Sequence, residues 1–151
     1  MSRKGHPPPR NVAEQGPYIG ALLRLAWQRI RKRIYSGVQS EGYSDLNAGH
    51  IAFFRYEGLN DRRPTELAER MQITKQSVNE VVRHLERRGY AERRLDPSDK
   101  RARLIRLTAR GRKLEAIVRK YARVAERELA RELGQRRFQE FRATLRKIKT
   151  L

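Results

Sequence analysis

The chain has 151 residues and carries 36 lysines and arginines against 17 aspartates and glutamates, so its formal net charge is +19. This length fits one domain, and the charge makes a polyanion such as DNA, RNA or an anionic membrane surface the first partner to consider. The absence of cysteine excludes thiol chemistry, three scattered histidines give no metal-ligand cluster, and no stretch approaches the ~20 apolar residues of a membrane span. We therefore expect a cytoplasmic protein with neither a metal ion nor a cofactor.

The first third of the chain predicts an arm followed by two helices. Residues 1–16 are rich in proline and lack apolar periodicity, which is typical of a flexible, extended arm. Over residues 17–36 apolar side chains recur at three- and four-residue spacing, which predicts a helix that ends before Gly37. A loop is expected next, and then a second helix capped by Ser44 or Asp45.

Residues 64–90 predict two helices separated by a tight turn. A short helix begins at Pro64, and a two-residue step then leads to Thr74, whose hydroxyl can cap the next helix. Apolar residues at i, i+3, i+4 and i+7 give this helix one buried face, and Gly89 has the place of the left-handed residue that follows a helix end. The pattern predicts a helix over residues 75–88.

The pattern then changes from a helical period to an alternating one. Residues 90–95 and 101–107 alternate and are joined by a segment with aspartate and proline in turn positions, which predicts a β-hairpin. Thr108 can cap a long helix that Gly134 interrupts before a last amphipathic helix. The predicted fold class is therefore mostly α with a small β-hairpin, an α+β arrangement.

Two helices around a tight turn, followed by a charged hairpin, describe a winged helix-turn-helix over residues 44–108, with 75–88 as the recognition helix and 90–107 as the wing. With the apolar stripe buried and about 100° of rotation per residue, four side chains point outward: Gln76, Glu80, Arg83 and Arg87. Their types read base edges or bind phosphates, except that Glu80 must accept from a cytosine amine or hold Arg83. The alternative is the solvated polar face that any surface helix has.

The composition of the hairpin favours nucleic acid. Residues 92–112 hold eight basic groups against three acidic ones. Asp99 lies two residues before Arg101, close enough across the turn to orient its guanidinium, and an arginine held in this way suits a narrow, electronegative minor groove. A hairpin that only aids solubility is the alternative.

Three segments resemble the multiple-antibiotic-resistance regulator (MarR) family: residues 64–71 (PTELAERM), 73–90 (ITKQSVNEVVRHLERRGY) and above all 96–111 (DPSDKRARLIRLTARG). The wing motif of the family, Asp-Pro-x-Asp-x-Arg and then Leu-Thr-x-x-Gly, falls here on Asp96, Pro97, Asp99, Arg101, Leu107, Thr108 and Gly111. The order of the helices extends the resemblance over nearly the whole chain from Pro17.

The resemblance implies a homodimer in which residues 17–36 and 109–151 form the dimerisation helices and two winged units bind a pseudo-palindromic operator in double-stranded DNA. It implies Arg101 as the minor-groove residue and Asp99 as its orienting partner. The apolar stripes of the terminal helices independently indicate a dimer, because a compact monomer of this length would struggle to cover them. The candidate DNA-binding residues are Thr74, Lys75, Gln76, Ser77, Asn79, Glu80, Arg83, Arg87, Asp99, Lys100, Arg101 and Arg103.

Many members of the family respond to small amphipathic effectors, often aromatic acids, bound between the dimer helices and the winged unit. The candidate lining residues here are Trp27, His50, Phe53, Phe54 and Tyr56. Their spacing is also that of an ordinary core face, the interpretation that we favour for any single one of them.

The leading interpretation is a sequence-specific transcriptional regulator that acts as a repressor. One alternative is an architectural, nucleoid-associated protein with little sequence preference. An RNA-binding accessory protein is another, although aromatic side chains that stack on single-stranded bases are missing from the predicted nucleic-acid face. We do not expect an enzyme, because the chain contains no catalytic triad, paired-carboxylate or phosphate-loop pattern.

Overall fold

The computed structural model describes residues 16–54 and 59–148. Within these ranges six helices and one two-stranded antiparallel sheet follow in the order α1 (Ile19–Ser40), α2 (Ala48–Phe53), α3 (Pro64–Met71), α4 (Lys75–Arg87), β1 (Ala91–Asp96), β2 (Asp99–Leu107), α5 (Ala109–Leu133) and α6 (Gln135–Ile148). The predicted class, mostly α with a β-hairpin, is confirmed. The predicted arm lies outside the described residues except for Gly16. No described helix combines the length and the apolar character that crossing a membrane requires.

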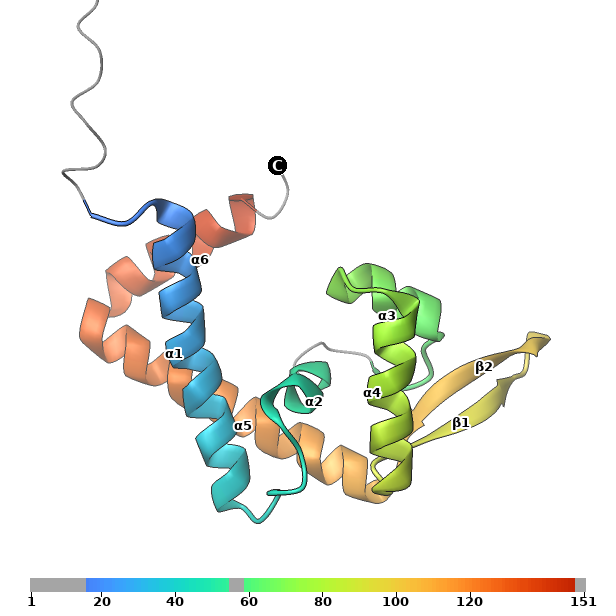
Figure 1. Ribbon diagram of the computed structural model, residues 1–151. Coiled ribbons are helices and arrows are strands. Elements are labelled where there is room, and N and C mark those ends of the chain that lie inside the picture. Colours follow the sequence, from blue (N-terminus) through green and yellow to red (C-terminus); the bar gives the residue numbers. More distant parts are fainter. Residues whose placement is uncertain (1–15, 55–58, 149–151) are drawn as a thin grey trace, which may run out of the picture.

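The long helix α5 connects the two parts of the molecule. Figure 1 shows α1 and α6 beside its C-terminal half, whereas α4 and the hairpin stand at its N-terminal end. A single apolar core runs from α1 through the winged unit into α5 and includes Val38, Phe54, Val82, Ile105 and Leu114. The winged unit is therefore anchored to the same helix that carries the terminal helices.

Helix α1 is longer than the sequence predicts, because Gly37 lies inside it instead of ending it. A Cβ atom at Gly37 would lie only 2.1 Å from Cδ1 of Tyr121, so the glycine lets α1 and α5 approach closely at their crossing. The chain leaves the helix at Ser40 and turns at Gly42, whose φ is +89°.

The prediction that Ser44 or Asp45 caps the second helix is wrong. The cap is Asn47, whose side chain accepts from the backbone N–H of His50 at 2.9 Å, while Nδ1 of His50 accepts from the backbone N–H of Asn47 at 3.2 Å. This reciprocal pair is a capping box with histidine in place of the usual glutamate or glutamine. Asp45 is occupied elsewhere, since its carboxylate accepts from the Tyr90 hydroxyl at 2.7 Å.

The local signals around the helix-turn-helix are confirmed. Pro64 is in the first turn of α3, and Oγ1 of Thr74 accepts from the backbone N–H of Ser77 at 3.1 Å as the cap of α4. Helix α4 ends one residue before the predicted end, and Gly89 follows with φ of +70°. The backbone N–H of Tyr90 then bonds the carbonyl of Leu85 at 2.9 Å, which closes the end of the helix.

The wing strands extend further toward the turn than predicted. Pairing runs from Ala91 opposite Leu107 to Asp96 opposite Asp99, so the loop between the strands is only Pro97 and Ser98. The Asp96 carboxylate stabilises this short loop by accepting from the backbone N–H of Ser98 at 2.8 Å and from its hydroxyl at 2.6 Å.

The Leu-Thr-x-x-Gly motif marks the junction of the wing with α5. Oγ1 of Thr108 caps α5 by accepting from the backbone N–H of Gly111 at 3.1 Å. A Cβ atom at Gly111 would lie 2.0 Å from the carbonyl oxygen of Tyr90, so only glycine lets the first turn of α5 pass this close to the start of the wing.

Candidate nucleic-acid interface

The outer face of α4 carries exposed polar side chains opposite its buried valines, as the periodicity predicts. Within the described ranges, three exposed cations of this helix make no side-chain hydrogen bond or ion pair: Lys75, Arg83 and Arg87. Unpaired guanidinium and ammonium groups on one helix face can bind phosphates or guanine edges without first giving up an internal partner.

Glu80 is held by Gln76 and not by Arg83. Nε2 of Gln76 donates to Oε1 of Glu80 at 3.2 Å, one turn further along α4. This pair presents an amide and a carboxylate together at the centre of the exposed face. A combined donor and acceptor can discriminate between bases, whereas the neighbouring cations attract any phosphate.

Three other predicted residues of α4 have structural contacts. Thr74 and Ser77 make the helix cap. Asn79 is only half exposed and accepts from Nη2 of Arg93 in β1 at 3.2 Å. Arg93 also lies 3.6 Å from the carboxylate of Glu86, so this one arginine ties the base of the wing to α4.

The wing presents Lys100, Arg101 and Arg103 as exposed cations, and none has a side-chain partner in the part of the chain that the structure describes. The expected contact between Asp99 and the guanidinium of Arg101 is not formed. Instead, Oδ1 of Asp99 accepts from the backbone N–H of Arg101 at 3.1 Å, while Oδ2 lies 3.6 Å from Nη1 of Arg63. Asp99 thus shapes the turn and leaves the Arg101 side chain unpaired.

Arg63, which the sequence analysis missed, holds the turn of the wing. Its Nε donates to Oδ2 of Asp96 at 2.9 Å, and its Nη2 donates to the same oxygen. Asp96 is buried, and its bonds from Ser98, reinforced by Arg63, lower the pKa of its carboxyl to about 2. The two residues are 33 positions apart, so no local pattern could have identified the pair.

A second polar cluster joins α5 to the end of α4. Nη2 of Arg110 donates to the Tyr90 hydroxyl at 2.9 Å and to Asp45 at 3.2 Å, and its guanidinium lies 4.4 Å from the centre of the Tyr90 ring. Burial, together with the bond to Asp45, raises the pKa of Tyr90 to about 12. Tyr90 therefore stays neutral and fixes the end of α4 relative to α5.

The candidate effector residues are not brought together. Phe53 and Phe54 are buried in the common core, and Tyr56 lies outside the described residues. His50 stacks on His84 of α4, with ring centroids 3.6 Å apart. Trp27 lies elsewhere, in a groove between α1, α5 and α6. The core interpretation holds for the two phenylalanines.

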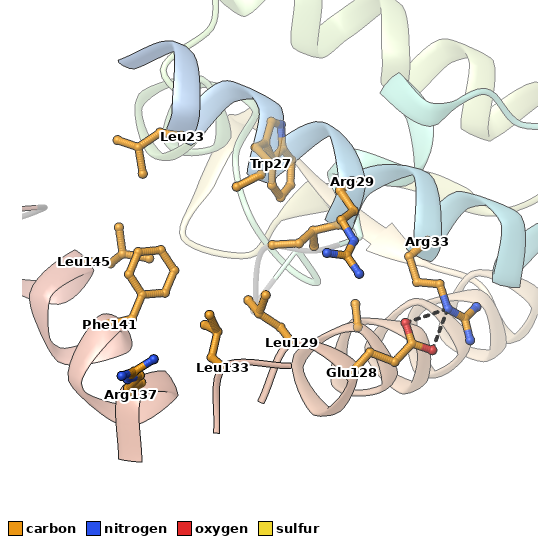
Figure 2. Close-up of a pocket in the computed structure, with 13 residues that line it drawn as sticks. Leu23, Trp27, Arg29, Arg33, Glu128, Leu129, Leu133, Arg137, Phe141 and Leu145 are labelled. Carbon is orange, nitrogen blue, oxygen red and sulfur yellow. Dashed lines mark hydrogen bonds and ion pairs between the residues drawn. The ribbon is translucent and has the colours of Figure 1, made fainter. Parts of the chain in front are cut away.

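The groove that contains Trp27 has a volume of about 760 Å³. Figure 2 shows Leu23 and Trp27 of α1 on one side of the groove, and Leu129 and Leu133 of α5 with Phe141 and Leu145 of α6 on the other. Trp27 and Leu145 are 43% and 38% exposed. Within the described residues, large apolar side chains are thus exposed on the terminal helices, at the other end of α5 from the wing (Figure 1).

Comparison with known proteins agrees with this geometry. Residues 45–102 match the model of the MarR family, whereas a search of curated protein sequences finds no match. A MarR transcriptional regulator from Methanosarcina mazei Go1 is 24% identical, with a TM-score of 0.73 over 87% of this chain and 94% of that chain.

Two structures of the regulator CouR are also similar. The transcriptional repressor CouR bound to a 23-mer DNA duplex is 22% identical, with a TM-score of 0.72 over 92% of this chain and 97% of that chain. CouR from Rhodococcus jostii RHA1 bound to p-coumaroyl-CoA is 22% identical, with a TM-score of 0.71 over 93% and 95% of the two chains. At this level of identity the likeness shows a shared fold. Residues 45–102 thus resemble the MarR family, and the described chain around them has the fold of MarR transcriptional regulators.

Proposed function

We propose that this protein is a cytoplasmic, sequence-specific transcriptional regulator that represses its target genes as a homodimer. The observation that carries the proposal is the set of exposed cations on α4 that have no side-chain partner within the described chain, beside a wing whose Lys100, Arg101 and Arg103 are equally free there. The fold is that of the repressor CouR, whose complex with a DNA duplex is known. Binding, and not catalysis, is the proposed activity.

Helix α4 would enter the major groove and the wing would reach the adjacent minor groove. The Gln76–Glu80 pair would discriminate between bases, since its amide and carboxylate can match an adenine edge or a cytosine amine. Lys75, Arg83 and Arg87 would supply phosphate contacts on either side, and Arg101 would enter the minor groove.

Dimerisation is proposed from the apolar groove of Figure 2. A second copy would cover the apolar side chains of α1 and α6 that are exposed among the described residues. A two-fold dimer of winged units would bind half-sites about one helical turn, roughly 10 base pairs, apart.

A small amphipathic effector is proposed as the releasing signal. Trp27 and His50 remain its candidate contacts, and CouR shows that one protein of this fold binds an aromatic acyl-CoA. Trp27 is the only tryptophan of the chain, so its fluorescence reports on events at the α1 groove directly. A compound that releases DNA without changing Trp27 fluorescence would place the effector site away from this groove.

The test is to select duplexes from a random pool and to measure affinity for selected and random DNA at about 0.15 M salt. A regulator should prefer its selected duplex by roughly 10³-fold or more.

The variant Arg101→Ala tests the wing. It should weaken binding to the selected duplex by about 1–3 kcal/mol and leave the dimer intact. Near-equal affinity for selected and random DNA would refute sequence-specific regulation and favour the architectural alternative.

A further inference from the structure

Much of the positive charge lies outside the winged unit. Residues 75–112, which hold the recognition helix and the wing, contain twelve cations and five acids. Residues 113–151 contain the same numbers, so each segment has a net charge of +7. The proposed binding of one operator uses only the first of these two segments.

The charges of α5 are sorted by face. Leu114, Val118 and Ala125 are buried and define the side of the helix that faces the core. With a rotation of about 100° per residue, the opposite side carries six exposed cations, here called the α5 basic face: Lys113, Arg119, Lys120, Arg123, Arg127 and Arg131. Arg119 begins a run of four arginines at four-residue spacing. The two glutamates within this segment pair with cations of other helices, Glu126 with Arg142 and Glu128 with Arg33.

Four cations of this face make no ion pair or side-chain hydrogen bond within the described ranges: Lys113, Arg123, Arg127 and Arg131. On the side toward α1 the opposite holds, because Arg29 pairs with Glu132 and Arg33 pairs with Glu128. Like charges four residues apart on a helix destabilise it. A bound polyanion would remove this repulsion.

We propose that the α5 basic face binds the phosphate backbone of a second DNA duplex, so that the protein bridges two segments of DNA. This inference rests on the proposed function for the first duplex. Lys113 to Arg131 span about 27 Å at about 1.5 Å per residue, over which a duplex presents about one phosphate charge per 1.7 Å of its axis. Because the arginines are four residues apart, the α5 basic face presents a cation about every 6 Å along the helix axis.

The position of α5 indicates that its basic face binds a separate duplex and does not extend the contact with the operator duplex. The first turn of α5 packs against the C-terminal end of α4, where Thr108 donates to the carbonyl of Gly89 at 2.6 Å. Figure 1 shows the turn of the wing and the first turn of α4 at the ends of these elements away from α5. The operator and the α5 basic face are therefore on different sides of the winged unit.

An anionic membrane fits this face less well than DNA. Helices that lie on membranes insert large apolar side chains beside their cations. The only exposed apolar residue between Lys113 and Arg131 on α5 is Ala116, which offers almost no insertable surface. Phosphate recognition by charge alone is what such a face can provide.

The test is to immobilise the selected operator duplex, load the full-length protein, and measure the capture of a labelled duplex of random sequence. The wild-type protein should capture the second duplex, with a steep loss of capture as salt increases. The double variant Arg123→Ala, Arg127→Ala should reduce capture at least about fivefold, while its affinity for the immobilised operator changes less than twofold.

Two controls separate location from total charge. Arg31→Ala with Lys32→Ala removes the same two charges from exposed positions of α1 and should leave capture unchanged. Arg123→Lys with Arg127→Lys keeps the charges and should retain capture. Three outcomes would overturn the inference. The wild-type protein could bind its operator but capture no second duplex, the double variant could still capture the second duplex, or the α5 basic face could bind anionic lipid vesicles instead. A protein without operator preference would instead refute the proposed function, and capture would still be measurable on random duplexes.

Discussion

The wing depends on one arginine that lies outside it. Arg63 precedes the first helix of the helix-turn-helix, and its guanidinium reaches across to the buried carboxylate of Asp96 at the turn of the wing. Removing one member of a buried ion pair leaves the other without a partner, which is costly. We therefore predict that Arg63 is a positioning residue, which fixes the turn of the wing that carries Arg101.

Arg63→Ala should weaken operator binding by up to about tenfold, a part of the loss expected for Arg101→Ala. Hydroxyl-radical footprinting should show protection lost at the minor-groove flanks and kept over the major-groove half-sites. Arg62→Ala is the matched control, because Arg62 pairs with Glu66 at 3.4 Å on the exposed surface. Arg63→Lys should restore part of the flank protection; a footprint identical to that of the wild type in Arg63→Ala would exclude the positioning role.

At the scale of helices and strands, local signals predicted some boundaries well and others badly. The cap at Thr74, the break at Gly89 and the hairpin each depend on residues close together in sequence, and the structure confirms all three. The predicted end of α1 was wrong because Gly37 lies inside the helix, where it packs closely against Tyr121, 84 positions later in the chain. Periodicity contains no information on such a contact, just as it contains none on the pair of Arg63 and Asp96.

Helices α2 and α4 meet through a pair of stacked histidines. The rings of His50 and His84 are 3.6 Å apart and inclined by 21°. Nδ1 of His84 lies 3.3 Å from Nη1 of Arg88, and its Nε2 is buried without a hydrogen-bond partner in the described structure. Burial is the main cause that lowers the pKa of both histidines. The charges of His84 and then Arg88 lower the pKa of His50 further. Arg88 also lowers the pKa of His84, against the opposing backbone and carboxylate of Asp45.

This arrangement predicts a stability that falls in mild acid. Because the folded pKa of each histidine is below the unfolded value of 6.5, the unfolded chain binds more protons once the pH drops below about 6.5. The stabilisation is complete above that pH and is lost as the pH falls toward the folded pKa values. The urea midpoint should therefore be lower at pH 5.5 than at pH 7.5.

The variant His50→Gln separates this effect from other titrations. Glutamine is a normal capping-box residue and can keep the contact with Asn47, but it does not titrate. The difference between the urea midpoints at the two pH values should shrink in His50→Gln. An unchanged difference would show that the stacked pair does not account for the acid sensitivity.

At the scale of the whole molecule, α5 links the winged unit to an apolar surface that the described residues leave exposed. The cluster of Asp45, Tyr90 and Arg110 fixes one end of α5 to the end of α4. The other end forms the groove with α1 and α6. A second copy bound at the groove would thereby set the distance between the two copies of α4. This distance must match the spacing of the two half-sites in a pseudo-palindromic operator.

Phe141→Asp with Leu145→Asp should therefore dissociate the dimer, because both side chains line the groove and two carboxylates there would be buried without partners. Sedimentation should give the mass of the single 17.8 kDa chain. Operator affinity should fall strongly, since two linked half-site contacts gain an avidity of about 10²–10⁴ that a monomer lacks. Gln139→Asp with Ala143→Asp adds the same charge on the exposed opposite side of α6 and should leave the dimer intact. If the groove variant still sediments as a dimer, the interface must lie on another surface, and the spacing of the recognition helices would have to be set there.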